Sequence, residues 1–129
     1  MPRCAPLLAA ALVLAAAATT ALAQPNRSFR ATALRGDLVL TAPPLVLLNR
    51  QPASLAPGAR IRDAGNRIVL SGQLTGQTLR VHYTRDLQGQ LLDVWLLTPA
   101  EAARKPWPST PAEAAAWRFD SAAQTWIKP

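Results

Sequence analysis

Residues 77–98, QTLRVHYTRDLQGQLLDVWLLT, decide the fold of this chain. Apolar and polar side chains alternate before and after Leu87-Gln88-Gly89, which is typical of two half-buried strands joined by a tight turn. With Gln88-Gly89 as a two-residue loop, Tyr83 lies opposite Val94, and the apolar side chains of both strands share one face. This segment therefore predicts an antiparallel hairpin with one buried side.

The two-residue period extends back along the chain to Phe29. Residues 49–58 contain Pro52 and Pro57 and predict a loop, whereas Ala64-Gly65-Asn66 predicts the turn of a second hairpin. Six short strands are expected, at 38–41, 45–48, 59–63, 67–71, 77–86 and 90–98. The predicted fold class is mainly β: a small antiparallel barrel or sandwich of about six strands, with two short helices and a C-terminal β-hairpin.

The C-terminal third contains two helix-start signals. The sequence TPAE occurs at 98–101 and again at 110–113. In each copy Thr caps the helix, Pro occupies its first turn and Glu reaches back to the cap. Pro106 and Pro108 limit the first helix to a few residues. We expect residues 99–129 to form an extension that packs on the β-rich domain.

A closing hairpin is expected at the C-terminus, between 117–120 and 124–127. Four large aromatic side chains lie in this region: Trp107, Trp117, Phe119 and Trp126. One interpretation is that they attach the hairpin to the barrel, because a small domain without disulfides needs large buried side chains. The other is an exposed row that stacks on sugars or lies at a membrane interface.

Residues 1–23 have the three parts of a secretory signal peptide. Arg3 supplies the positive charge, and 7–18 is an uncharged apolar run too short to cross a bilayer as a helix. Ala21-Leu22-Ala23 is a small-x-small cleavage site, so we expect the mature chain to begin at Gln24. These features predict a soluble protein of the periplasm; the alternative is an uncleaved anchor.

The composition excludes several classes of chemistry. Residues 24–129 form one domain of 106 residues, of which 46 are apolar, with one His and no Cys or Met. Without cysteines in this part there is no disulfide scaffold and no thiolate chemistry. A single histidine cannot assemble a zinc or copper site from nitrogen and sulfur ligands. We therefore expect no metal and no cofactor.

Six of the seven carboxylates have an expected structural role. Four of them lie at the start or end of a predicted strand, next to a turn: Asp37, Asp63, Asp86 and Asp120. Two belong to the capping boxes: Glu101 and Glu113. Asp93, in the middle of a predicted strand, has none. In the hairpin register it is a diagonal neighbour of His82, within reach of a hydrogen bond.

Two interpretations of this strand face remain open. It is either a small polar site made of Arg80, His82, Asp93 and Trp95, or the solvent-exposed side of a two-stranded ribbon. No nucleophile accompanies the His–Asp pair, which alone is half of a catalytic triad. We therefore predict that the protein is not an enzyme.

Positive charge is concentrated in the first part of the domain. Residues 24–85 carry a net charge of +7, and residues 86–129 carry −1. Arg60 and Arg62 share one strand face and Arg67 lies across the following turn, so these arginines, with Arg80, are candidates for binding an anion or a partner. The alternative is that they serve only as solubilising cations.

Four segments resemble small exported proteins of β-proteobacterium-like genomes: APPLVLLN at 42–49, LAPGARIRD at 55–63, NRIVLSG at 66–72 and VWLLT at 94–98. The match covers about two-thirds of the mature chain. The resemblance implies export and a β-rich domain, and it assigns no catalytic residue.

Three functions follow as hypotheses. The first is a non-catalytic periplasmic binding or structural module whose arginines engage an anionic envelope component or an acidic protein. The second is a small-ligand binder or enzyme centred on His82, Asp93 and Trp95. The third is an envelope assembly factor that binds extended peptides at a sheet edge. Nucleic acid is not expected as a partner, because basic and aromatic residues do not interleave.

Overall fold

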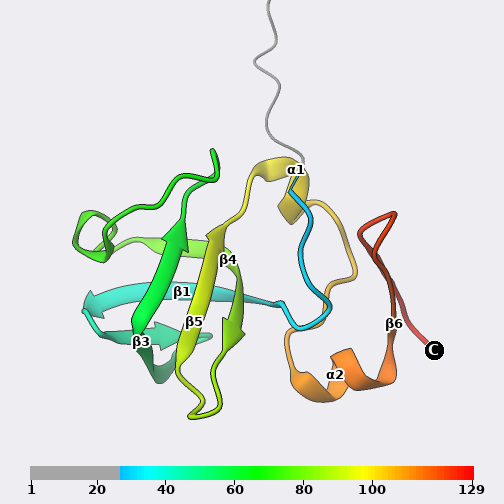
Figure 1. The fold of residues 1–129 in the computed structure, drawn as a ribbon, viewed down its shortest axis with the longest axis horizontal. Coiled ribbons are helices and arrows are strands. Elements are labelled where there is room, and N and C mark those ends of the chain that lie inside the picture. The colour runs from blue at the N-terminus through cyan, green and yellow to red at the C-terminus, as the bar shows by residue number, and fades with distance from the viewer. Residues whose placement is uncertain (1–26) are drawn as a thin grey trace, which may run out of the picture.

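The structure is a computed structural model that describes residues 27–129. The predicted signal peptide and its cleavage after Ala23 lie outside the described residues. The architecture is mainly β, with a five-stranded sheet, two short helices and a C-terminal two-stranded sheet (Figure 1). The five strands of the sheet are β1 (Leu34–Ala42), β2 (Leu45–Leu48), β3 (Gln51–Arg62), β4 (Thr78–Arg85) and β5 (Leu91–Leu96).

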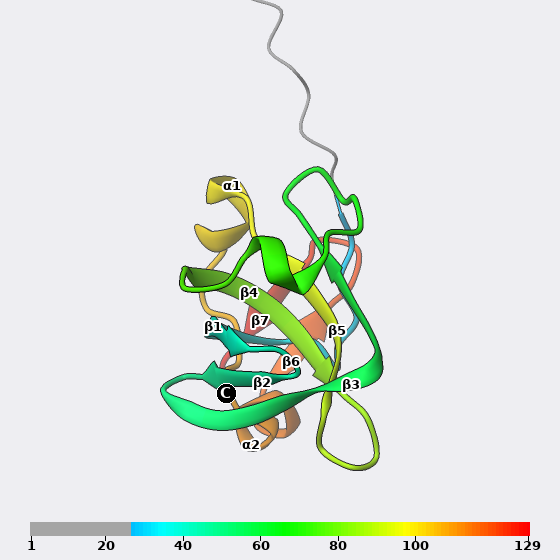
Figure 2. The same ribbon diagram turned by 90° about the vertical axis from the view of Figure 1, so that its left-hand side faces the viewer.

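The sheet closes on itself as a barrel in the order β1-β2-β3-β5-β4 (Figure 2). Four of its pairs are antiparallel, and β3 and β5 are parallel. The predicted fold class is confirmed, with the barrel rather than the sandwich. The parallel pair is a departure from the expected all-antiparallel arrangement.

The β4–β5 hairpin has the predicted register. Tyr83 pairs with Val94 and His82 with Trp95. The carboxylate of Asp86 accepts hydrogen bonds from the backbone N–H groups of Gln88 and Gln90, both at 2.9 Å, and so fixes the turn. This is the local role expected for an aspartate at the end of a strand.

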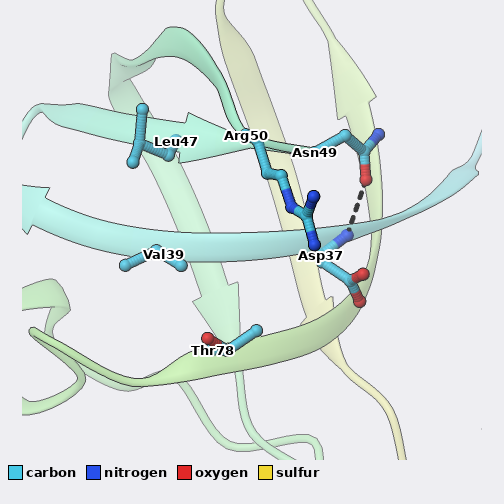
Figure 3. A pocket seen from close by; sticks show the side chains of 6 residues that line it. All are labelled: Asp37, Val39, Leu47, Asn49, Arg50 and Thr78. Atoms are coloured by element: carbon cyan, nitrogen blue, oxygen red, sulfur yellow. Dashed lines mark hydrogen bonds between the residues drawn. The ribbon is translucent and has the colours of Figure 1, made fainter.

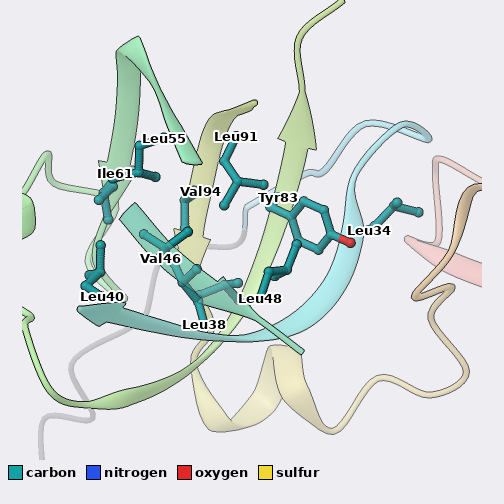
Figure 4. Packing of buried hydrophobic residues seen from close by; sticks show 11 residues of the cluster. Leu34, Leu38, Leu40, Val46, Leu48, Leu55, Ile61, Tyr83, Leu91 and Val94 are labelled. Atoms are coloured by element: carbon teal, nitrogen blue, oxygen red, sulfur yellow. The ribbon is translucent and has the colours of Figure 1, made fainter. Parts of the chain in front are cut away.

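The barrel interior is filled by aliphatic side chains from all five strands, together with Tyr83 (Figure 4). Leu38, Leu40, Leu91 and Val94 have no exposed surface. Because side chains alternate along a strand, every second residue is left on the outer face of the barrel. That outer face carries most of the candidate functional residues.

Strand β3 corrects the expected loop at 49–58. The strand begins at Gln51, and tertiary pairing overrides the two prolines: Pro52 lies opposite Leu47 in the pairing with β2. Pro57 lies within an irregularity between Leu55 and Arg60, where the pairing with β5 is interrupted. Pro57 therefore does not interrupt a continuous ladder.

The predicted strand at 67–71 is not formed, and the two-residue alternation at 29–33 does not mark a strand. In 67–71, pairing is limited to a single bridge between Arg62 and Ile68, and a short 3-10 helix, η1 (Ser71–Gln73), follows. In 29–33, the chain makes a turn in which the N–H of Ala33 donates to the carbonyl of Arg30. The alternation there reflects burial of Phe29 and Ala33 against another layer and not strand pairing.

The C-terminal part forms as predicted. It contains α1 (Pro99–Ala102), α2 (Pro111–Ala116), β6 (Arg118–Asp120) and β7 (Thr125–Ile127). The Thr98–Glu101 capping box is complete. In the second box Thr110 caps the Glu113 N–H, but the Glu113 carboxylate bonds hydroxyl groups and not the cap backbone.

A second apolar layer lies between the barrel and the C-terminal part. It contains Phe29, Ala33, Trp107 and Trp126, all less than a tenth exposed. In Figure 1 the segment that precedes β1 runs between the barrel and the β6 strand. The tryptophans therefore attach the C-terminal part to the barrel, as one of the two interpretations expected. Trp117 and Phe119 are half-buried at the margin of this layer.

Replacing Trp107 by Ala is expected to lower the free energy of unfolding by about 3–5 kcal/mol. The indole packs edge-on against Phe29 and its Nε1 donates to the carbonyl of Ala33 at 2.9 Å, so truncation removes both packing and a buried hydrogen bond. Urea denaturation followed by far-ultraviolet circular dichroism measures the loss. Leu87→Ala is the matched control, because that side chain is fully exposed, and its effect should stay within about 0.5 kcal/mol.

Candidate functional site

The outer face of the barrel carries a row of four side chains across four strands. The register pairs Arg62 with Trp95, Trp95 with His82, and His82 with Arg35. Neighbours in such a row lie about 5 Å apart and on the same side of the sheet. The C-terminal part covers the β1–β4 end of this row, and the β3 end is more open.

His82 lies at the covered end and is 1% exposed. Its ring stacks on Trp107, with centroids 4.2 Å apart, and meets the edge of Phe29 at 4.4 Å. Nε2 accepts a hydrogen bond of 3.2 Å from Nε of Arg35. The imidazole proton therefore resides on Nδ1, which has no partner among the described residues.

The expected hydrogen bond between His82 and Asp93 is not formed, which is a correction. Asp93 lies in the adjacent row, where its Oδ2 and the Thr84 hydroxyl are 3.4 Å apart and its own N–H donates to that hydroxyl. Trp95 remains beside His82 but packs edge-on against Phe29. The solvent-exposed alternative is also wrong for His82, because residues far away in sequence cover this face.

Arg35 is the central polar group of the covered region. Its guanidinium donates to three carbonyls that end α1, those of Glu101, Ala102 and Arg104, at 2.9, 3.2 and 2.8 Å. It also lies over the Trp107 ring at 5.6 Å. Burial, together with the charge of Arg80, lowers the pKa of Arg35 to about 10, which leaves it positively charged at neutral pH.

A second buried arginine, Arg27, joins the beginning of the described chain to α1 and to the ends of β3 and β5 by hydrogen bonds. Nε of Arg27 donates to Oε2 of Glu101 at 3.0 Å, and the other nitrogens reach the carbonyls of Asp63 and Leu96. Burial alone raises the pKa of Glu101, but hydrogen bonds from Arg27 and Thr98 and the Arg27 charge outweigh it, so the pKa lies below its usual value.

Sequence reasoning missed both buried arginines. Arg27 and Arg35 count toward the basic charge of residues 24–85, yet both side chains are buried inside the fold. In the capping box, one carboxylate oxygen of Glu101 accepts from the Thr98 N–H, and the other oxygen needs a second donor, which is Arg27. That spare oxygen is the only local signal in the sequence for the buried arginine. Nothing in the sequence around Arg35 indicates its partners, because these lie 47 or more residues away.

The four arginines singled out from sequence separate into two groups. Arg60 and Arg67 are exposed and Arg62 is half-buried, while Ile61 between them points into the core, as the alternation predicted. Among the described residues these three guanidinium groups form no side-chain hydrogen bond or ion pair. We call Arg60, Arg62 and Arg67 the arginine face. Arg80 is different: its Nη1 is paired with Oδ1 of Asp37 at 3.0 Å.

Among the several hollows on the surface of the described residues, three are defined by the side chains that line them. One, of about 430 Å³, lies outside β1 and β2, where Asn49 accepts from the Asp37 N–H and Arg50 extends above Asp37 (Figure 3). A second, of about 520 Å³, adjoins Asp93 and α2. A third, of about 400 Å³, lies beside Pro57 and Leu70. His82 and Trp95 line none of them.

No protein-family model, curated protein or solved structure matches the chain. Within 27–129, no three His, Cys, Asp or Glu side chains come together in a way that could hold a metal ion. In the same range no helix is long and apolar enough to span a membrane.

Replacing Arg35 by Lys is expected to destabilise the fold by about 3 kcal/mol, although the charge is kept. An ammonium lacks the planar fork that reaches His82 and the α1 carbonyls together, so buried acceptors lose their donors. Urea denaturation measures the change, and Arg50→Lys, at an exposed site, serves as the control. Equal midpoints for the two variants would contradict a central role for Arg35.

The stability of the protein is expected to fall by about 2 kcal/mol between about pH 7.5 and pH 5. Burial, aided by the charge of Arg35, lowers the pKa of His82 to about 2. The unfolded state takes up a proton near pH 6.5 whereas the folded state does not, so stability is complete above that pH and declines below it. The chain contains no other histidine that would titrate in this window.

His82→Gln tests this origin of the pH dependence, because glutamine retains an acceptor for Arg35 but does not titrate. Its unfolding free energy should be nearly constant over the same pH range. A slope equal to that of the original protein would mean that another group is responsible.

Proposed function

We propose that the protein is a non-catalytic binding module of the bacterial envelope. Its arginine face, Arg60, Arg62 and Arg67, engages an anionic envelope component or an acidic protein. One observation carries the proposal: these three guanidinium groups have no charged or hydrogen-bonding side-chain partner among the described residues. Guanidinium forks bind carboxylate and phosphate groups in pairs of parallel hydrogen bonds.

Four other arginines of residues 24–85 already donate hydrogen bonds within the fold. Arg27 and Arg35 are buried and each of their guanidinium nitrogens donates a hydrogen bond, Arg80 is paired with Asp37, and Arg85 donates to the carbonyl of Gly89. Arg60 lies beside Asp93 in the register of β3 and β5, yet no ion pair joins them. The arginine face therefore retains its charge for an external ligand.

The alternative centred on His82 has less support. The side chain is 1% exposed, and its ring is enclosed by Phe29, Trp107 and Arg35. With the pKa at about 2, the imidazole neither gains nor loses a proton at physiological pH. This interpretation would need the covering layer to open.

The alternative of peptide binding at a sheet edge also has less support. Each of the five barrel strands has a partner on both sides, so the long free edge that strand addition requires is not available. The interrupted stretch of β3 between Leu55 and Arg60 contains Pro57, which has no N–H to donate. Export to the periplasm, through the signal peptide expected in 1–23, stays part of the proposal.

The test replaces Arg60, Arg62 and Arg67 together by Gln and measures binding to vesicles containing phosphatidylglycerol and to proteins of an envelope extract. If the ligand is an anionic surface, each arginine contributes about 1 kcal/mol, so the triple variant should bind about a hundredfold more weakly. Vesicles of phosphatidylcholine alone show how much binding is independent of charge.

A matched control removes the same charge elsewhere by replacing Arg50, Arg118 and Lys128 by Gln. These three cations are also exposed. The control should retain nearly all binding apart from a small long-range effect that salt screens. If both triple variants lose binding equally, total charge and not the arginine face is responsible. If neither loses binding to vesicles or to extract proteins, the proposed function is wrong.

A further inference from the structure

The cleft of about 520 Å³ between α2 and the barrel combines features of a small-ligand site. Its walls come from the turn at 30–32, the outer side of β4 and β5, and the Ala-rich helix α2. These segments are distant in sequence, so the cleft exists only in the folded chain. Pockets for small ligands are mostly apolar with a few placed polar groups, and they typically measure 300–1,000 Å³.

Two guanidinium groups line the cleft. Arg85 is held in place, because its Nη1 donates to the Gly89 carbonyl at 2.7 Å and its charge lies 5.6 Å from the centre of the Tyr83 ring. Arg30 is exposed and has no side-chain hydrogen bond or ion pair within 27–129. One cation is therefore pre-organised and the other is free to close on a ligand.

The remaining polar groups limit the ligand. Thr84 and Asp93 also line the cleft and are bonded to each other. One carboxylate against two guanidinium groups leaves the cleft with net positive charge, which attracts an anion. A second negative group on the ligand would be repelled if it approached Asp93.

The apolar part of the cleft suits a short hydrocarbon chain. Leu92, 37% exposed, is one of the few large apolar side chains left in contact with solvent in the described part of the chain. It faces the same cleft as Ala114 and Ala115 of α2. A ligand that covered Leu92 would remove apolar surface from water at no cost to the folded core.

We propose that this cleft binds a small aliphatic monocarboxylate, with the carboxylate between Arg30 and Arg85 and the hydrocarbon chain along Leu92 and α2. Bidentate guanidinium–carboxylate contacts fix the head group, and burial of the chain supplies most of the remaining affinity. This site is distinct from the arginine face and does not depend on the function proposed for it.

Titration of the ¹⁵N-labelled protein with octanoate tests the proposal through the chemical shifts of backbone amides. We expect saturable shifts for residues that line the cleft, whereas acetate and 1-octanol, which lack the chain and the charge respectively, should bind at least tenfold more weakly. Suberate, with a carboxylate at each end, should also bind more weakly. N-acetyl-leucine shows whether a peptide C-terminus is preferred to a fatty acid.

Variants locate the site. Arg30→Gln is expected to weaken octanoate binding roughly tenfold through loss of one charge-assisted contact, and Leu92→Ala to weaken it several-fold. Arg50→Gln removes the same charge outside the cleft and should bind as the original protein does. Because Arg30, Arg50 and Leu92 are exposed, circular dichroism should show that all three variants fold.

Several results would overturn the proposal: shifts confined to residues outside the cleft, equal binding of octanoate and 1-octanol, or equal affinities for Arg30→Gln and Arg50→Gln. The variant lacking Arg60, Arg62 and Arg67 should still bind octanoate within about twofold, because none of the three lines the cleft. Failure of the octanoate test therefore leaves the arginine face untouched, and failure of the vesicle test leaves the cleft untouched.

Discussion

The buried guanidinium of Arg35 is the interaction on which the arrangement of this protein depends. It originates on β1, is almost fully buried, and donates to partners on β4 and at the end of α1. A buried charge is tolerated only when it is hydrogen-bonded, and here each guanidinium nitrogen donates, in all to three backbone carbonyls and one imidazole nitrogen. This requirement fixes where the chain leaves α1, and hence where Trp107 enters the second apolar layer against His82.

Closing that layer decides which parts of the barrel remain accessible. The β1 and β4 end of the outer row lies under Phe29 and Trp107, so a histidine that the hairpin register places on the outer face becomes a buried neutral group. The β3 end of the same row stays open to solvent. The polar residues that remain available to ligands are therefore those on β3 and those around the cleft beside α2.

Features set by residues close together in the sequence could be predicted, and features set by distant residues could not. The β4–β5 register, the Asp86 turn and the Thr98 cap are set by neighbours within a few residues, and each was predicted correctly. The first part of β3, residues 51–58, is wrongly predicted as a loop because its prolines argue locally against a strand, whereas pairing with β2 and β5 outweighs them. The covering of His82 was missed for the same reason, since Phe29 and Trp107 approach it from opposite ends of the domain.

Net charge alone is consequently a poor guide to which arginines of this protein are free to bind an anion. Of the nine arginines in residues 24–85, Arg27 and Arg35 lie inside the fold and Arg80 is neutralised by Asp37. A guanidinium N–H that already donates to a carbonyl or carboxylate must break that hydrogen bond to bind anything else. Inside the fold, the acceptor left behind cannot bond to water instead, so the break costs free energy. Binding is therefore expected from arginines that still have guanidinium N–H groups exposed to solvent. The arginine face meets this condition for a large anionic partner. In the cleft, Arg30 is unpaired within 27–129 and Arg85 is exposed although one of its nitrogens donates to Gly89, so this pair suits a small anion.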